Sequence, residues 1–424
     1  MAEGSQPRVR RLSGLEHVLQ HAWPEMEVPF SLGEYRQRLQ RVREEMAKAG
    51  IDMLWLTSPE SQHYLSGYAA EWYQSESPKD WMPLSGIAVH VDHDDFIFFN
   101  SVAEAVLSRY HTIARDVRLF PRPQHSPGID FIVNELRAQG WLPGRVGFEL
   151  WSYRPNRAVS ELLQAAFERA GAEVVDGTDI VRSVRSIKSP QELAYIEIAD
   201  RIAHIGMEAA RNALRPGVTE LEVYGEMVAA MARAGGENPG ITMPVVSGSK
   251  TFSYHALASR KQIMPGELVI VDVAGVYHRY HADLARTFSI GEPHPDIREF
   301  CERQAGVWDV IRGILRPELP VAELLDTVKR YYQEQGIWEQ RAWVGGYEFG
   351  VAFPPDWVGP FYYDAGTDPG DAVFRPGMVV NHESNFFTPH HSGINFVVDM
   401  LMFREDGAYI MGNLPFTLTV IDEW

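Results

Sequence analysis

The stretch PGELVIVD, residues Pro265–Asp272, decides the fold, because a close copy of it, PGMVVNHE, occupies Pro376–Glu383. Each copy places Pro-Gly first, then mainly apolar strand-forming residues, and a carboxylate seven positions after the proline. Upstream, LRPGVTELEV (residues 214–223) has a weaker echo in LRPELPVAEL (residues 315–324). The C-terminal half is therefore predicted to be duplicated. Two copies facing each other across a pseudo-twofold axis would deliver two acids to one cleft, and paired carboxylates in a cleft usually indicate chemistry.

Length and composition indicate a globular chain of two domains. The 424 residues exceed one ordinary domain, and 45% of them are apolar. The formal charge is −18, from 57 acids against 39 Lys and Arg, with no basic stripe along the sequence. This argues against nucleic acid or anionic membrane surfaces as partners. The longest apolar runs are far shorter than the roughly 20 residues that span a bilayer.

The N-terminal arginines and the single cysteine bear on location. No apolar segment follows the arginines near position 10, so we expect no signal peptide. Cys301 is the only cysteine, which excludes internal disulfides and any cysteine metal cluster. We therefore expect the protein to be cytoplasmic.

The first part of the chain alternates helix and strand signals. Ser31 to Glu34 resembles a capping box that opens a helix running to Ala49, with Gly50 as its C-terminal stop. A strand is predicted over 52–56, a hairpin over 86–91 and 95–99, helices near 129–139 and 155–171, and a strand over 146–150. These predict a mixed α/β domain.

A second set of signals marks the domain boundary. In VRSVRSIKSPQEL, from Val181, the residues Ser189, Pro190 and Glu192 give three agreeing helix-start signals. We place the boundary near 185, with domains 1–185 and 186–424. A long helix to about 214 and another capped by Thr219 follow. Strands are expected near 241–246, 268–274, 281–290, 378–384 and 395–403, with helices from 295 and near 320–335. Together they predict a two-helix, strand-rich repeat.

The densest constellation is VDVAGVYHRYHADLARTF, residues 271–288. Asp272 and Asp283 would reach one face of two antiparallel strands, with Gly275 as the expected bend. The pair could hold a divalent metal, bind a cationic substrate, or act as acid and base. The alternative is two solvated turn acids, but the flanking residues are strongly apolar, and a buried carboxylate needs a partner or a role.

His255 lies in SGSKTFSYHALASRK, a loop predicted to follow a strand. A histidine near carboxylates suits proton transfer, because its reference pKa lies near neutrality. The alternative for a lone histidine is a structural or merely exposed position.

These segments resemble the creatinase, aminopeptidase P and prolidase superfamily, which has the pita-bread fold. The resemblance covers essentially the whole chain and is carried by IKSPQEL, SGSKTFSYH, VDVAGVYHRYHADLART, RPGMVVNHES and MFREDG. It implies an α+β protein, in which a creatinase-like α/β domain (1–185) precedes a pita-bread catalytic domain with a pseudo-twofold internal duplication (186–424).

The resemblance also implies which residues correspond to the metal ligands of the superfamily's metallopeptidases. Those enzymes hold two divalent ions with two aspartates, a histidine and two glutamates, and three of these positions fall on Asp272, Asp283 and Glu383. The histidine position falls on Tyr347, and the last glutamate position on Val398. We therefore expect no metal cofactor, because valine offers no donor and a neutral phenol is a poor one.

The alternative is a single divalent ion (Mn, Fe, Zn or Co) on Asp272, Asp283 and Glu383. The residues that could then complete its coordination are Glu348, His382, His390 and His391.

The function that the resemblance implies is hydrolysis of a carbon–nitrogen bond in a small nitrogenous compound, a cyclic amidine, a guanidino compound or an amide. GYEFGVAFPPDW and AGVYHRYHADLART resemble the ectoine hydrolase and creatinase-like branch, although creatinase's characteristic glutamate corresponds to Ala285. An organic cation would occupy the space that metals fill elsewhere. His255 would shuttle the proton, Glu383 and Asp272 would orient substrate and water, and Asp283 would support the charge.

Three other functions remain open. A metal-dependent Xaa-Pro dipeptidase or aminopeptidase would need the missing ligands replaced. A lyase that releases dimethyl sulfide from dimethylsulfoniopropionate relies on bound iron. A non-catalytic binding module would typically have lost the acids that this chain retains.

Aromatic residues are expected at the substrate. In GYAAEWYQSESPKDWMPL, residues 67–84, we assign Tyr73 and Trp81 to substrate binding, together with Tyr347, Glu348 and Trp357. In the superfamily a loop at 67–84 commonly reaches the partner subunit's active site, which implies a homodimer whose active site is completed by the partner's N-terminal domain. An aromatic wall can attract a small cation by roughly 0.5 to 2 kcal/mol. The alternative is that these aromatics pack a domain interface.

Overall fold

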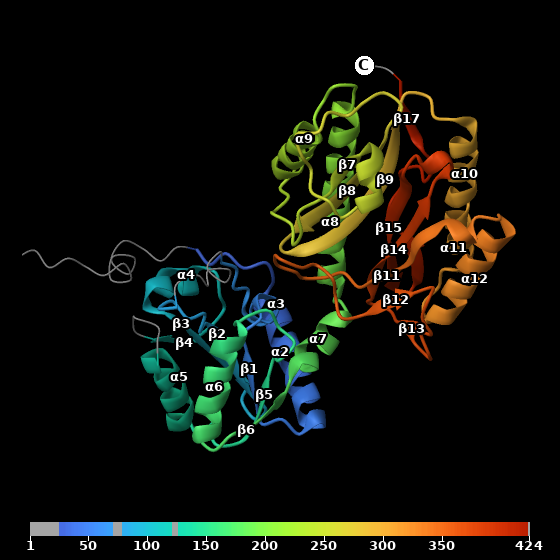
Figure 1. Ribbon diagram of the computed structural model, residues 1–424. Helices are drawn as coiled ribbons and strands as arrows, with labels where there is room; N and C mark the ends of the chain where they lie inside the picture. Colours follow the sequence, from blue (N-terminus) through green and yellow to red (C-terminus); the bar gives the residue numbers. More distant parts are fainter. Residues whose placement is uncertain (1–24, 71–78, 121–125, 423–424) are drawn as a thin grey trace, which may run out of the picture. The chain divides into compact units, whose positions relative to one another are not determined.

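The computed structural model describes residues 25–70, 79–120 and 126–422 (Figure 1). The chain divides into two compact units, Met1–Val184 and Arg185–Trp424. Each unit has its own sheet and its own buried apolar clusters. Across the described ranges, no helix has both the length and the apolar character needed to cross a membrane.

The first unit is built on a six-stranded mixed sheet with the order β4-β3-β2-β1-β5-β6. Its strands are β1 (Met53–Leu56), β2 (Gly86–His90), β3 (Phe96–Ser101), β4 (Asp116–Phe120), β5 (Arg145–Phe148) and β6 (Glu173–Asp176). Its helices are α2 (Leu32–Ala49), α3 (Pro59–Ser66), α4 (Ala105–Tyr110), α5 (Ser126–Ala138), α6 (Arg157–Arg169) and α7 (Thr178–Ser186), with a short 3₁₀ turn at Val102–Glu104. One apolar cluster joins the sheet to α5 and α6, and another joins it to α2, α3 and α7. The sheet is thus covered on both faces, as the expected α/β domain requires.

Most of the local signals at the start of this unit act as the sequence predicts. The Ser31 side chain accepts the backbone N–H of Glu34, and α2 ends at Gly50, whose φ of 64° is left-handed. The expected hairpin forms between β2 and β3, which pair antiparallel. The predicted capping box is only half formed, because the Glu34 carboxylate accepts a hydrogen bond from Arg38 Nε at 3.1 Å instead of returning to Ser31.

The second unit contains a nine-stranded sheet with the main order β12-β11-β14-β15-β9-β8-β7, to which β16 and β17 add. Its strands are β7 (Val245–Ser247), β8 (Leu268–Tyr277), β9 (Tyr280–Ile290), β11 (Arg341–Tyr347), β12 (Tyr362–Asp364), β14 (Val379–Phe387), β15 (Ile394–Arg404), β16 (Gly407–Ile410) and β17 (Thr419–Ile421). β10 (Leu319–Pro320) and β13 (Val373–Phe374) form a separate pair. Its helices are α8 (Pro190–Ala213), α9 (Glu220–Arg233), α10 (Pro295–Ala305), α11 (Val307–Ile314) and α12 (Val321–Glu334), and the 3₁₀ turns are η3 (Gly248–Ser253), η4 (Trp338–Gln340) and η5 (Pro389–His391).

The two Pro-Gly copies open equivalent strands, which confirms the predicted duplication. Gly266 before β8 and Gly377 before β14 both have left-handed φ values, 82° and 89°. The Gly266 N–H donates to Ile290 O at 2.6 Å, at the end of β9, and the Gly377 N–H donates to Phe403 O at 2.8 Å, near the end of β15. Each copy is therefore one strand of an antiparallel hairpin, β8–β9 or β14–β15.

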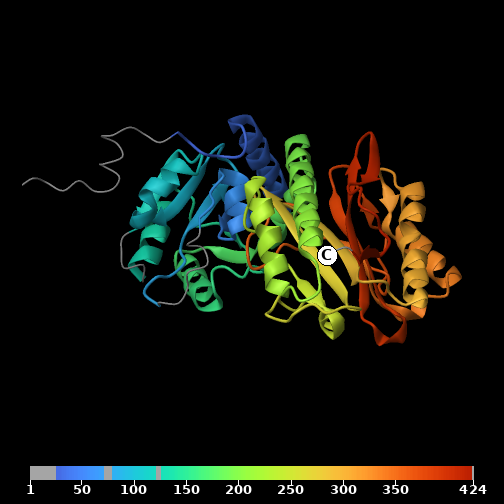
Figure 2. The ribbon, with the colours of Figure 1, turned by 90° about the horizontal axis from the view of Figure 1, so that it is seen from above.

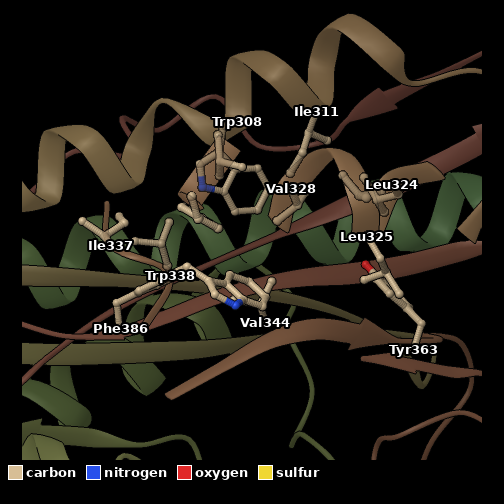
Figure 3. Close-up of a cluster of buried hydrophobic side chains, with 14 of the residues drawn as sticks. Trp308, Ile311, Leu324, Leu325, Val328, Ile337, Trp338, Val344, Tyr363 and Phe386 are labelled. Atoms are coloured by element: carbon tan, nitrogen blue, oxygen red, sulfur yellow. The ribbon is translucent and has the colours of Figure 1, made fainter. Parts of the chain in front are cut away.

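Two groups of helices pack on one face of this sheet, the face opposite to Asp272 and Glu383. Figure 2 shows the green helices α8 and α9 beside the yellow strands β8 and β9, and the orange helices α10 to α12 beside the red strands β14 and β15. Apolar side chains of α11 and α12, including Trp308, Ile311, Leu324 and Val328, pack toward Val344 of β11 and Phe386 of β14 (Figure 3). This apolar core therefore supports β14, the strand that carries Glu383, on the face opposite to the Glu383 side chain.

Three local expectations are wrong. Gly275 is not the bend, because it lies inside β8 while His278 and Arg279, with φ of 49° and 67°, form the turn to β9. A Cβ at Gly275 would meet Ala199 O of α8 at 1.9 Å, so glycine is needed there for helix contact. The strand expected over 241–246 begins only at Val245, since Pro244 has no N–H to donate. The second copy contains three helices, α10, α11 and α12.

Candidate active site

Four residues form one row across the centre of the nine-stranded sheet. Asp272 of β8 pairs with Ala285 of β9, Ala285 pairs with Val398 of β15, and Val398 pairs with Glu383 of β14. Directly paired residues of neighbouring strands share a face, so the four side chains point to the same side. The duplicated copies thus place an acid at each end of the row, and two apolar side chains lie between them.

Asp283 lies on the same face, because it precedes Ala285 by two positions on β9. A side-chain hydrogen bond joins Asp283 and Asp272, and both residues are buried. Two ionised carboxylates cannot bond in this way, since neither has a hydrogen to donate. Such a bond therefore requires one of the two carboxyl groups to carry a proton.

Asn381 of β14 connects the two ends of the row. Its Nδ2 donates to Asp283 Oδ2 at 2.8 Å and to Glu383 Oε1 at 3.0 Å. The backbone N–H of Tyr347 donates to Asn381 Oδ1 at 2.8 Å, which fixes the orientation of the amide. A neutral donor therefore stands between two carboxyl groups that would otherwise repel each other.

Glu383 has donors for both carboxyl oxygens. Asn385 Nδ2 donates to Glu383 Oε2 at 2.9 Å, and the side chain of Tyr347 also hydrogen-bonds Glu383. By contrast, Asp272 Oδ1 and Asp283 Oδ1 are buried and have no hydrogen-bond partner among the described residues. These two oxygens, and Asn385 Oδ1, which is likewise buried and unpartnered among the described residues, are acceptors available to a bound molecule.

Burial and mutual repulsion shift the pKa values of all three acids upward. Burial first, and then Glu383, raise the pKa of Asp272 to about 7. Burial and the charge of Asp283 raise the pKa of Glu383 to about 8. Burial and Asp272 raise the pKa of Asp283 well above its usual range. A cation placed among them would offset the repulsion and displace protons.

The two-ion centre of the superfamily's metallopeptidases does not fit these residues. Val398 offers no ligand atom and packs with Ala285, Ile270 and Phe396 in an apolar cluster. The phenol of Tyr347 bonds Glu383, and the amide hydrogens of Asn381 point at the two carboxyl groups that would have to face metal ions. An amide NH₂ cannot coordinate a metal. Of the usual donor set, only the three acids are present.

Of the four residues proposed to complete a single-ion site, three are engaged elsewhere and the fourth is exposed. Glu348 forms a buried ion pair with Lys188. His382 alternates with Glu383 along β14, and its ring packs edge-on against Trp308, 5.5 Å away, behind the sheet. His390 Nε2 lies 2.8 Å from Asp296 Oδ2, and His391 is exposed. A single ion would rely mainly on the free oxygens of the two aspartates.

His255 lies beyond η3 and is exposed. Its ring lies edge-on to Tyr254 at 4.5 Å, and within the described ranges no hydrogen bond joins it to the three acids. Tyr254 is half-buried, packs against Phe396 at 5.1 Å, and is close enough to Glu383 for that charge to raise its pKa, although burial contributes more. Of these two residues, Tyr254 is thus the one whose pKa responds to the charge of Glu383.

The aromatic residues assigned to substrate binding differ in position. Tyr347 stacks on Phe349 at 5.3 Å, and Phe349 lies edge-on to Trp357 at 5.0 Å. Trp357 is buried, so it supports Phe349 and Tyr347 by packing. Trp81 belongs to the first unit and is 49% exposed. Tyr73 lies outside the described residues.

Sequence reasoning missed Asn381, Asn385 and Tyr254. The first two carried a readable signal, since NHESN (residues 381–385) alternates Asn, Glu and Asn at the period of a strand. Tyr254 had no comparable signal. It stands next to His255 in a loop, where spacing does not fix the direction of a side chain.

Two models of known protein families match the chain, one in each part. The model of the creatinase/prolidase N-terminal domain matches residues 38–187, and that of metallopeptidase family M24 matches residues 194–403. The ectoine hydrolase of Halomonas elongata is 24% identical over 93% of this chain and 99% of its own length. The Xaa-Pro dipeptidase of Pyrococcus furiosus is 23% identical over 88% of this chain and 97% of its own.

Solved structures show the same fold. An Xaa-Pro dipeptidase from Bacillus anthracis matches with a TM-score of 0.74 at 21% identity, over 91% of this chain and all of the other. A prolidase from Thermococcus sibiricus matches with a TM-score of 0.76 at 15% identity, over 92% of this chain. The paired domains, the duplicated hairpins and the matches along both units agree, and the chain belongs to the creatinase, aminopeptidase P and prolidase superfamily, as one of its hydrolases.

Proposed function

We propose that this hydrolase cleaves a carbon–nitrogen bond of a small nitrogenous compound, a cyclic amidine, a guanidino compound or an amide, without a two-ion centre. The observation that carries the proposal is the amide of Asn381, which donates to both Asp283 and Glu383. Through these hydrogen bonds the amide holds the two acids together, as bridging cations do in a metallopeptidase. The ectoine hydrolase among the relatives supports the same class of reaction.

The free acceptors of the site suit a small organic cation. Asp272 Oδ1 and Asp283 Oδ1 are buried and unpartnered among the described residues, on adjacent antiparallel strands. A planar amidinium or guanidinium offers two parallel N–H groups, which match paired carboxyl oxygens with charge-assisted hydrogen bonds. The apolar side chains of Ala285 and Val398 lie beside them and would contact the carbon skeleton of the substrate.

One proton on the pair of Asp272 and Asp283 provides both an acid and a base for the reaction. As the oxygen of water bonds to the amidine carbon, the electrons of its C=N bond move onto nitrogen, and an ionised carboxylate takes a proton from the water. The second C–N bond then breaks, and a carboxylic acid gives its proton to the departing nitrogen. The remaining O–H proton passes to the carboxylate left behind as C=O forms, and the departing amine takes the surplus proton, so an amidinium and water give an amide and an ammonium ion.

Glu383 has a positioning role in this scheme. Its three donors, Asn381, Asn385 and Tyr347, hold the carboxylate in one orientation, so it can accept a hydrogen bond from substrate or water without moving. His255 would exchange the proton with solvent, since it is exposed and adjoins Tyr254 at the edge of the site.

The test combines metal analysis with turnover. The purified enzyme would be analysed for metals, treated with EDTA, and supplied with ectoine, creatine and the dipeptide Gly-Pro, with and without Mn²⁺. We expect turnover of ectoine or creatine that survives EDTA. Occupancy by two ions together with loss of activity on chelation would disprove the metal-independent reaction.

A metal-dependent Xaa-Pro dipeptidase is the second candidate. A relative of that name matches 88% of the chain, against 93% for the ectoine hydrolase, and the two free aspartate oxygens could hold one ion. Cleavage of Gly-Pro only in the presence of Mn²⁺, with no turnover of ectoine or creatine, would establish this function in place of the first.

A further inference from the structure

A second group of potential ligands lies at the surface of the second unit, on elements separate from the row of acids. His294 precedes α10, Asp296 is in its first turn, and His390 belongs to η5 between β14 and β15. One ligand atom from each residue lies within 4.8 Å of the other two. The side chains are 54%, 57% and 50% exposed, so solvent ions can reach them.

The backbone and its hydrogen bonds hold these side chains toward one another. His294 Nδ1 accepts the backbone N–H of Asp296 at 3.2 Å, so this nitrogen carries a lone pair rather than a hydrogen, and an ion bound there would displace this hydrogen bond. It lies 3.6 Å from Asp296 Oδ2, and the same oxygen lies 2.8 Å from His390 Nε2. The two imidazole rings are 4.4 Å apart. His390 has a left-handed φ of 60°, which brings its ring over the start of α10 rather than along the strand direction.

We propose that His294, Asp296 and His390 bind a late first-row divalent metal ion, with Zn²⁺ as the favoured occupant. Two imidazole nitrogens and one carboxylate oxygen form a borderline donor set that suits zinc and disfavours calcium or magnesium. Three protein ligands leave a fourth position of a tetrahedral ion for water. For the ion to bind His390 Nε2, the hydrogen of a neutral ring must move to Nδ1, and a protonated ring must release one proton.

The electrostatic balance permits the site. The positive end of the α10 dipole opposes a cation, but the carboxylate of Asp296 lies at the same helix end and offsets it. Binding would connect the start of α10 to the turn between β14 and β15, and β14 carries Glu383. The expected role is therefore structural, a metal link across that turn, and it does not depend on the reaction proposed above.

Calorimetric titration of the full chain with ZnCl₂ tests the proposal, with His391→Gln as the matched control. His391 occupies the same turn, is exposed and also has a left-handed φ, but it lies outside the ligand group. We expect His390→Gln and Asp296→Asn each to weaken one zinc-binding event at least tenfold, while His391→Gln leaves it unchanged. Replacing the zinc by Co²⁺ should give visible absorption bands in the wild type that His390→Gln loses.

The double variant Asp272→Asn/Asp283→Asn separates this site from the acids of the active site. We expect the same zinc-binding event to persist in it. Zinc binding that disappears in the double variant but not in His390→Gln would overturn the proposal, as would a wild-type protein that binds no zinc. Circular dichroism of each variant before titration verifies that the fold is intact, which is expected because the three ligand side chains are exposed.

Discussion

Val398 separates this site from a metallopeptidase centre more than any other residue does. It stands directly between Ala285 and Glu383 in the row of four, at the position where the superfamily's metallopeptidases have a glutamate. Its neighbours Ala285, Ile270 and Phe396 are apolar and pack in the same cluster. The surroundings of position 398 therefore suit a valine and not a charged glutamate. Asn381 completes the change, because its amide bridges acids that an ion would otherwise bridge.

Val398→Glu should therefore recreate a metal requirement. A carboxyl group added to Asp272, Asp283 and Glu383 in this buried site has no counter-charge, so the metal-free variant should lose about 2 to 4 kcal/mol of unfolding free energy. Mn²⁺ should restore a large part of that loss, as measured by thermal unfolding with and without the ion.

Val398→Gln is the control for this experiment. It introduces the same shape without the charge, so Mn²⁺ should leave its unfolding temperature unchanged. Equal responses of the two variants to Mn²⁺ would show that the row of acids does not govern metal binding.

At the scale of elements, the two Pro-Gly turns allow a paired prediction. Both glycines have left-handed φ, so Gly266→Ala should cost about 1 to 2 kcal/mol of unfolding free energy from backbone strain alone. A Cβ at Gly266 meets nothing within 4 Å, whereas one at Gly377 would lie 2.8 Å from Ile187 Cγ2 and 3.1 Å from Lys188 O. Gly377→Ala should therefore be clearly more destabilising in urea unfolding. Equal losses of unfolding free energy in the two variants would mean that Ile187 and Lys188 move aside at no energetic cost.

Helix α8 provides a prediction for pH dependence. Asp200 is 7% exposed, and burial raises its pKa to about 7 against the attraction of His204, Arg201 and Arg286 and with the repulsion of Asp399. Between about pH 4 and pH 7 the folded state then holds a proton that the unfolded state has lost. The contribution of Asp200 to stability is thus full below pH 4 and declines as the pH rises through 7.

Asp200→Asn should remove this decline. We expect the variant to be more stable than the wild type at pH 8 and to show a smaller difference in unfolding free energy between pH 5 and pH 8. Glu208→Gln, an exposed acid on the same helix, should leave the difference unchanged. A wild-type slope in Asp200→Asn would assign the pH dependence to other groups.

Local signals in the sequence predicted the positions of helices and strands better than they predicted the contacts between them. The capping boxes at Ser189 and Thr219 both form, and α8 and α9 begin directly after them. Strand periodicity placed Asp272, Asp283 and Glu383 on buried strands, where the structure brings them together. Gly275 was misjudged because its reason, contact with Ala199 of α8, involves residues 76 positions apart in the sequence. Asn381 was missed for the same kind of reason, since its role depends on Asp283 across the sheet.

At the scale of the whole molecule, the homodimer implied by the superfamily can be tested through its active sites. We propose that the N-terminal domain of one subunit completes the site of its partner, with Trp81 as one contributor. Trp81→Ala in the first unit and Glu383→Gln in the second should each lower turnover at least tenfold. The first variant alone cannot distinguish a shared site from a local packing defect.

Mixing the two variants makes that distinction. After unfolding and refolding together in equal amounts, a shared site gives hybrid dimers in which one of the two sites has both native residues. Such a symmetric exchange restores about a quarter of wild-type turnover. If each chain completes its own site, every site in the mixture still carries one substitution, so the activity stays at the level of the separate variants. Light scattering during size-exclusion chromatography must show a dimer of the 48.0 kDa chain, because a monomer would exclude a shared site.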